Sequence, residues 1–437
     1  MASTYLQRTQ TAGNQKTFTI SSWLKRSGNF ANYNHLFTNS PNPGTWDSVR
    51  FDNDDQLAVR INNDSYVIKT NRKFRDASGW YHIVIAVDTT QGTSSNRVKI
   101  YVNGTQETSL ASSSYPTQNL DTNFNKNSQI IRIGQNSWSS GNQTFDGSMS
   151  YAALVDGTQE LPTIFGETDS VTGQWKIKTG ITPSSGWGNN GFLILKNSNS
   201  VTDQSGQGNN FTVGSGTLTK TEDNPSNVFC TFNKLYNTNA NGDLIPVLTS
   251  GNTILLGHGG SYWYQIPGTL AFTSGKFYWE CKFNSGTNLD KNTPGVIDYE
   301  KCFGTGQFQD QTGSVFYKNE DGGETRLDGS TSSANYGTLT QNQILGVAVD
   351  MDAGTPTVKF YRNGSLLATV NASSLAGKFV TPAQMVYGSG QFQLNFGNGY
   401  FGTTAVSSAG TNASGNGIFE YDVPSGYTAL STKGLNL

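Results

Sequence analysis

The sequence has 437 residues and a formal net charge of −2, with only 14% charged residues but 50 glycines. Such a length favours two or three domains, and the 24 Phe, 19 Tyr and 8 Trp residues argue against a disordered chain. Lys and Arg are scattered, so we expect no nucleic-acid partner. Apolar runs such as "HIVIAV" are far shorter than the roughly 20 residues that span a bilayer, so we expect no membrane insertion.

The N-terminal third reads as a series of short strands separated by polar turns. The opening "MASTYLQRTQTAGNQK" lacks the apolar core of a secretory signal, so we expect no export by the usual route. "WYHIVIAVD", residues 80–88, is apolar on both faces, as expected of a strand between two packed layers. "RVKIYVNG", residues 97–104, alternates apolar and polar residues and ends in Asn103-Gly104, which predicts a tight hairpin turn.

The middle of the chain has a different composition. Residues 166–223 are rich in Gly, Ser and Asn but contain Trp175, Trp187, Phe192 and Phe211. A free linker does not need such aromatics, so we expect an ordered connector packed against the first sandwich.

The C-terminal half repeats the strand and hairpin pattern. "ILGVAVD" is apolar throughout, Val358 and Phe360 alternate with polar neighbours, and Asn363-Gly364 repeats the turn 260 positions after Asn103-Gly104. No run of ten or more residues has convincing helical periodicity. The sequence therefore predicts an all-β fold with two similar units.

Two families resemble the two halves. Residues 1–165, with "WYHIVIAVDTT" and "VKIYVNG", resemble laminin-G-like domains of the concanavalin A-like superfamily. Residues from about 270 onward, with "SGKFYWECKF" and "LNFGN", resemble a SPRY domain, another member of that jelly-roll group. The resemblance implies two concanavalin A-like jelly-roll β-sandwiches, at 1–165 and 224–437, joined by the connector 166–223.

A further resemblance covers most of the chain. "FGETDSVTGQWK", "DQSGQGNNFTV" and the closing "GYTALSTKGLNL" are similar to virion structural proteins of tailed phages of marine and freshwater bacteria, cyanophages included. This implies a non-enzymatic protein of the virion surface, made in the host cytoplasm: a capsid decoration, knob or head fibre. It also implies other virion proteins as partners, host surface glycans as ligands, and a multicopy or homo-oligomeric protein.

Two alternatives to that function remain open. A tail fibre or receptor-binding protein would share both sandwiches, but the chain begins almost at its first strand, which leaves no room for a shaft. A glycanase needs two carboxylates about 5 to 10 Å apart, and Asp298 and Glu300 in "DYEKC" would share a strand face. The laminarinase-like Glu-x-Asp-x-x-Glu spacing is missing, and we expect these acids to be structural and the protein not to be an enzyme.

Residues for other chemistry are few. His82 follows Trp80-Tyr81 in an apolar strand, which predicts core packing, and the three cysteines at 230, 281 and 302 are expected to be small buried residues. We expect no cofactor. The laminin-G-like resemblance raises the question of a rim Ca²⁺, for which "FDNDDQ" offers Asp52, Asp54 and Asp55, although Asp is also an ordinary turn former.

Carbohydrate binding calls for exposed aromatic rings flanked by polar side chains. Three stretches that read as loops have this composition: "PGTWDS", "NSWSSGNQ" and "GGSYWYQ". The candidates are Trp46, Trp138, Tyr262, Trp263 and Tyr264. The alternative is that these rings close the ends of their sandwiches or form intersubunit contacts.

Overall fold

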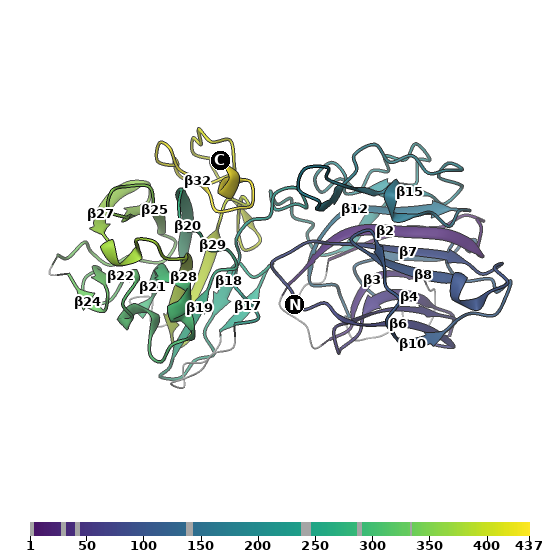
Figure 1. The fold of residues 1–437 in the computed structure, drawn as a ribbon, viewed down its shortest axis with the longest axis horizontal. Helices are drawn as coiled ribbons and strands as arrows, with labels where there is room; N and C mark the ends of the chain where they lie inside the picture. Colours follow the sequence, from purple (N-terminus) through teal and green to yellow (C-terminus); the bar gives the residue numbers. More distant parts are fainter. Residues whose placement is uncertain are drawn as a thin grey trace. The chain divides into compact units, whose positions relative to one another are not determined.

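The computed structural model describes residues 4–27, 32–39, 44–136, 143–236, 246–285, 291–332 and 334–437. The chain forms two compact units, Met1–Lys220 and Thr221–Leu437 (Figure 1). Within the described ranges the regular elements are β-strands and short 3-10 helices, with no α-helix, which confirms the all-β prediction. No helix in those ranges is long and apolar enough to cross a membrane.

The first unit contains two main antiparallel sheets among its described residues. One sheet comprises, in spatial order, β10 (Leu110–Ser114), β6 (Tyr66–Lys73), β5 (Gln56–Ile61), β4 (Asp47–Phe51), β3 (Asn34–Asn39), β11 (Ile130–Ile133), β1 (Tyr5–Thr9) and β16 (Thr212–Ser215). The other comprises β15 (Phe192–Ile194), β12 (Gly147–Asp156), β2 (Thr17–Arg26), β7 (Tyr81–Asp88), β8 (Val98–Val102) and β9 (Thr105–Gln106). Apolar side chains of both sheets meet in one core.

Strand β7 is buried on both faces because it lies between two apolar layers. Ile83 and Ile85 point into the core between the sheets. Val84 and Ala86 point the other way, into a second cluster that includes Phe165. The strand therefore reads as a continuous apolar run.

The two Asn-Gly pairs form equivalent hairpin turns. Asn103 and Gly104 have φ values of 48° and 81°, and Asn363 and Gly364 have 46° and 81°, as a two-residue turn of the predicted kind requires. Each Asn side chain also accepts a hydrogen bond from a backbone N–H at the start of the neighbouring strand, β7 or β25 (Ile344–Asp350). The distances are 2.8 Å from His82 to Asn103 and 2.9 Å from Ile344 to Asn363.

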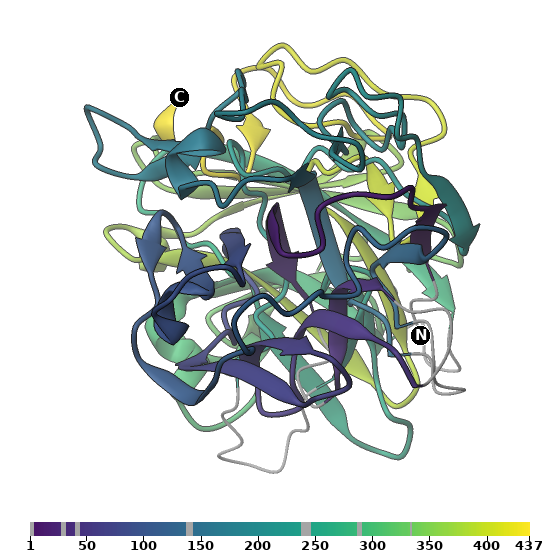
Figure 2. The same cartoon turned by 90° about the vertical axis from the view of Figure 1, so that its right-hand side faces the viewer.

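The Gly-rich middle segment lies within the first unit up to Lys220. Its strand β15 pairs with β12, and its strand β16 pairs with β1, so it extends both sheets. It also forms a small hairpin from β13 (Gly166–Thr168) and β14 (Trp175–Ile177). Figure 1 shows this teal part of the chain beside β12, and Figure 2 shows the same ribbon turned by 90°.

The second unit repeats the two-sheet arrangement. One sheet comprises β17 (Val247–Thr249), β18 (Ile254–Leu256), β29 (Gln391–Asn395), β20 (Lys276–Ser285), β25 (Ile344–Asp350), β26 (Thr357–Arg362) and β27 (Ser365–Asn371), with β32 (Thr428–Ala429) parallel to β20. The other comprises β19 (Trp263–Pro267), β28 (Val380–Tyr387), β21 (Thr293–Asp298), β22 (Ser314–Lys318), β23 (Glu324–Leu327) and β24 (Ser330–Thr331). One apolar core fills the space between them.

A second apolar cluster covers the outer face of the β20 and β25 sheet. It joins Tyr278 and Ala348 to Phe419, Tyr427 and Ala429 of the C-terminal segment. The remaining short elements are β30 (Tyr400–Phe401), β31 (Thr404–Ala405), η1 (Ser94–Asn96), η2 (Pro162–Ile164), η4 (Tyr299–Phe303), η5 (Phe308–Asp310), η6 (Ser373–Leu375) and η7 (Gly434–Asn436). Both units thus carry an outer layer on the sheet that contains the repeated hairpin.

Candidate functional site

The best candidate site is an aromatic surface at the start of edge strand β19. Side chains alternate along the strand, so Tyr264 is buried in the core and donates its hydroxyl to the Gly259 carbonyl oxygen at 2.7 Å. Trp263 is half-buried and lies opposite Tyr387 of β28, with ring centroids 5.4 Å apart in an edge-to-face arrangement. Tyr262, just before the strand, is 55% exposed.

Two polar groups border these rings. The Lys291 ammonium lies 4.5 Å from the centre of the Tyr387 ring, a cation–π contact. His258 is exposed, with its ring 5.6 Å from that of Tyr264. We call Tyr262, Trp263, Tyr387, Lys291 and His258 the aromatic surface.

The backbone holds this surface in place. The loop before β19 is tied to the loop after β28 by three hydrogen bonds, from Gly257 to Gly390, from Gly259 to Gly388 and from Gly388 to Tyr262, each 3.0 Å long. A Cβ on Gly260, which has φ +73°, would lie 3.0 Å from the Tyr262 ring. The exposed ring therefore rests directly on backbone, which limits the freedom that it would lose on binding a ligand.

The other aromatic candidates lie elsewhere. Trp46 is only 8% exposed, which corrects the expectation of a loop ring open to solvent. Asn63 holds the Trp46 backbone, since its side chain accepts from the Trp46 N–H at 2.7 Å and its own N–H donates to the Trp46 carbonyl at 3.0 Å. The core position of Tyr264 is a second correction. Trp138 lies outside the described residues.

The proposed calcium ligands are engaged with cationic side chains. The Asp52 carboxylate forms ion pairs with Arg50 at 2.8 Å and with Arg60 at 2.5 Å. Burial opposes ionisation there, but the hydrogen bonds from these guanidinium groups lower the pKa of Asp52 overall. Asp54 pairs with a lysine, and Asp55 pairs with two arginines. A cation would have to compete with these groups, and the described residues contain no group of three or more His, Cys, Asp or Glu placed to hold a metal ion.

The paired carboxylates of "DYEKC" do not share a strand face. Asp298 ends β21 and is buried, and its carboxylate accepts the Glu300 N–H at 3.2 Å as the cap of helix η4. Glu300 is exposed on that helix. The expected shared face is therefore wrong, because the strand stops between the two residues.

His82 is locked in the core of the first unit, as predicted. Its Nδ1 accepts the indole N–H of Trp175 at 2.9 Å, and its Nε2 lies 2.9 Å from the Ser21 hydroxyl. Burial lowers the pKa of His82 to about 3, so the ring is neutral at ordinary pH. The prediction of buried thiols is also confirmed, because all three cysteines are free and buried.

Comparison with known sequence families supports the fold of the first unit. The sequence profile of the concanavalin A-like lectin/glucanases superfamily matches residues 1–161. Among solved structures, the SPRY domain of human HERC1 is similar at 19% identity over 32% of this chain and 87% of that one, with a TM-score of 0.28. The TRIM65 PSpry domain is similar at 15% identity over 38% and 90%, with a TM-score of 0.29.

A pentraxin also matches. The native heptameric SAP-like pentraxin from Limulus polyphemus is similar at 17% identity over 35% of this chain and 69% of that one, with a TM-score of 0.26. No curated protein matches the sequence. Both units are antiparallel two-sheet β-sandwiches, and the first matches the concanavalin A-like profile.

The structure joins two of the five predicted aromatic residues, Tyr262 and Trp263, with three that sequence reasoning missed. Tyr387 and Lys291 reach the site only because β28 pairs with β19 and β21 in the folded sheet. His258 carried a weak signal, since it stands in the same polar stretch, "GHGGSYWYQ", four residues before Tyr262.

Proposed function

We propose that this chain is a non-enzymatic binding protein whose second unit recognises carbohydrate on a host surface through the aromatic surface. The observation that carries this proposal is the ring of Tyr262, exposed and fixed on its loop beside Trp263. A lectin-type fold in the first unit is in keeping with it.

The chemistry of the surface favours a sugar. An aromatic ring offers an apolar face to the C–H groups of a pyranose, and buried ring area contributes most of the energy in such contacts. The surrounding loop residues are Gly and Ser with His258 and Lys291 at the border, which leaves donors for sugar hydroxyls. Because the backbone already fixes the loop, little ordering entropy opposes binding.

A panel of bacterial surface polysaccharides tests this role. Tyr262→Ala should weaken binding of the best ligand by about tenfold, the equivalent of about 1.4 kcal/mol. Phe379→Ala is the matched control, because Phe379 is 60% exposed in the same unit but outside the aromatic surface. Equal binding by both variants would show that the aromatic surface is not the binding site. If the chain bound a purified protein and no polysaccharide, its ligand would be a protein and not a carbohydrate.

For the biological setting, we propose the outside of a tailed-phage particle, as a capsid decoration, knob or head fibre present in several copies. The support is the resemblance of "FGETDSVTGQWK" and its companion stretches, together with a nearly neutral surface rich in Asn, Ser and Gly. Immunogold labelling of intact virions tests the setting. Label at the tail tip alone would favour a tail fibre or receptor-binding protein, and no label on virions would remove both.

Glycan cleavage is the other candidate activity, and it has a separate test. Polysaccharide incubated with the purified chain should keep its length, since Asp298 is buried as a helix cap. Chain shortening that disappears in Glu300→Gln would show that the protein is an enzyme.

A further inference from the structure

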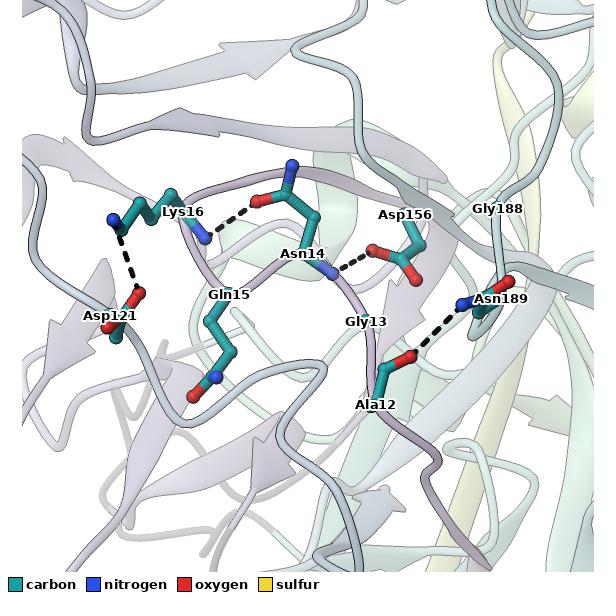
Figure 3. A pocket seen from close by; sticks show the side chains of 9 residues that line it. All are labelled: Ala12, Gly13, Asn14, Gln15, Lys16, Asp121, Asp156, Gly188 and Asn189. Carbon is teal, nitrogen blue, oxygen red and sulfur yellow. Dashed lines mark hydrogen bonds and ion pairs between the residues drawn. The ribbon is translucent and has the colours of Figure 1, made fainter.

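A polar depression of ≈ 600 Å³ lies at the end of the first unit, far along the chain from the aromatic surface. Figure 3 shows its lining, which comes from four separate parts of the chain. The loop between β1 and β2 forms most of it, and residues near the ends of other strands complete it. The lining residues are Ala12, Gly13, Asn14, Gln15, Lys16, Asp121, Asp156, Gly188 and Asn189.

The β1–β2 loop is fixed by hydrogen bonds along its length. Asn14 N–H donates to the Asp156 carboxylate at 2.7 Å, and Gly13 N–H donates to the Asn125 carbonyl at 2.9 Å. The Asn189 side chain donates to the Ala12 carbonyl at 3.1 Å. Asp156 is itself buried, and burial raises its pKa against the hydrogen bonds that it accepts.

Glycine at position 13 is required for this arrangement. A Cβ there would lie 2.4 Å from an Asp156 carboxylate oxygen and 2.5 Å from the Asn190 amide nitrogen. The loop can lie against Asp156 only because that atom is missing. The depression is thus shaped before any ligand arrives, which lowers the entropy cost of binding.

Several polar groups in the depression have no hydrogen bond within the described residues. The Asn14 oxygen accepts the Lys16 and Thr17 N–H groups, which leaves the Asn14 amide nitrogen free. The Gln15 side-chain amide and the Asn189 side-chain oxygen are also unused there. In Figure 3 the Gln15 amide extends away from the pinned side of the loop.

The charged lining residues are one lysine and two aspartates, so the depression carries a small net negative charge. Lys16 and Asp121 face each other with 3.8 Å between the ammonium and the carboxylate. Asp156 already accepts backbone N–H groups from Asn14 and Asn190. Aromatic and large apolar side chains are missing from the lining, so a nucleobase or an acyl chain finds no matching surface.

We propose that this depression is a second ligand site and that it takes a neutral saccharide. The unused amide groups of Asn14, Gln15 and Asn189 supply both donors and acceptors, and a sugar hydroxyl can donate and accept at once. The small net negative charge of the lining disfavours strongly anionic glycans. The inference does not rest on the aromatic surface, because the two sites use different units and different chemistry.

The test is a printed array of neutral and acidic oligosaccharides probed with the labelled full-length chain. Gln15→Ala should weaken binding to neutral saccharides by about tenfold, because it removes a free amide and none of the bonds that pin the loop. Gly13→Ala should abolish that binding by displacing the loop from Asp156. Gln106→Ala is the matched control, since Gln106 is an exposed glutamine of the same unit outside the depression.

Tyr262→Ala separates this inference from the proposed function. Loss of neutral-saccharide binding with Gln15→Ala supports the site, whether or not Tyr262→Ala also weakens the signal. Unchanged binding with Gln15→Ala, or no binding of any neutral saccharide by the unaltered chain, overturns it. Hydrogen-exchange protection of the β7 peptides that is unchanged in Gly13→Ala shows that the first unit of this variant is folded.

Discussion

The outer layers of the two units are held to equivalent strands by different chemistry. Thr17 pairs with Asp88 in the first unit, and Lys276 pairs with Asp350 in the second. Ser21 and Glu280 each lie four residues after Thr17 and Lys276, so they occupy equivalent positions in their sheets. In the first unit a neutral hydrogen-bond chain runs from Ser21 through His82 to Trp175. In the second unit the buried carboxylate of Glu280 bonds the outer layer to the sheet.

The buried carboxylate of Glu280 accepts hydrogen bonds from four donors. Its oxygens accept the backbone N–H groups of Glu420 and Tyr421, each at 2.9 Å, the Tyr278 hydroxyl at 3.3 Å and the Asn395 amide at 3.4 Å. Burial nevertheless raises the pKa of Glu280 to about 7. The same type of β-sandwich can therefore hold its outer layer either with neutral hydrogen bonds or with a buried carboxylate. These two arrangements have opposite consequences for the pH dependence of stability.

Acidification should separate the two units most strongly. Burial lowers the pKa of both His35 and His82 from 6.5 to about 3, so the unfolded first unit binds more protons than the folded one between these values. Its free energy of unfolding should therefore fall as pH drops below 6.5, by on the order of 5 kcal/mol between pH 7 and pH 4.

The second unit should show the opposite trend around Glu280. Its raised pKa gives stability that is fully present below pH 4.5 and is lost as pH rises to about 7. Urea unfolding followed by pulsed hydrogen exchange and mass spectrometry reports the two units separately. Parallel pH profiles for the β7 and β25 peptides would break the comparison.

Removal of the Glu280 carboxylate should have the next largest effect. Glu280→Ala leaves three buried donors without an acceptor, the Tyr278 hydroxyl and the Glu420 and Tyr421 N–H groups, which should cost the second unit about 3 to 4 kcal/mol. The Asn395 amide keeps the Ile418 carbonyl as an acceptor at 2.8 Å. The Glu420 and Tyr421 amides should then exchange faster with solvent. Glu300→Ala, at an exposed glutamate of the same unit, should change little. Equal effects of the two substitutions would contradict the role of Glu280.

Trp175→Phe tests the neutral chain of the first unit. The ring remains stacked near His82, but the N–H that donates to His82 is lost, so the first unit should lose about 1 to 2 kcal/mol. Trp187→Phe is the control, because Trp187 packs on the same outer cluster without bonding His82. Denaturant midpoints give the comparison, and a larger loss for Trp187→Phe would exclude the hydrogen bond as the cause.

The two hairpin glycines offer the finest comparison. Both have φ +81°, so alanine at either should cost about 1 kcal/mol from backbone strain alone. A Cβ on Gly104 would lie 2.6 Å from the Trp175 ring, and one on Gly364 would lie 2.9 Å from the Tyr421 ring. Gly104→Ala should therefore destabilise its unit somewhat more than Gly364→Ala destabilises the other. Thermal unfolding of the two variants measures the difference, and the reverse order would contradict it.

Local sequence signals predicted the repeated frame well. Alternation in "RVKIYVNG" and the Asn-Gly pair determine a strand and a turn within a few residues, so no distant contact was needed to predict them. The bond between Trp175 and His82 joins residues 93 positions apart, and nothing in either local stretch indicates it. The "FGETDSVTGQWK" stretch thus forms a hairpin that is bonded to His82 through Trp175. At its turn, Asp169 accepts the Val171 and Thr172 N–H groups.

The candidate sites were predictable only in part. Composition pointed to Tyr262 and Trp263, but it could not separate them from Trp46, whose loop has a similar composition although its ring is buried. Tyr387 and Lys291 depend on strand pairing. The polar depression depends on loops that meet only in the folded unit, so its residues carried no sequence signal.

Hydroxyl-radical footprinting of the full-length chain, with and without the saccharide that binds it best, tests the central claim most directly. The account predicts that oxidation of Tyr262 and Trp263 falls severalfold when the ligand is bound, while oxidation of Phe379 stays unchanged. Unchanged oxidation of Tyr262 and Trp263 at saturating ligand would contradict the assignment of the aromatic surface as the recognition site.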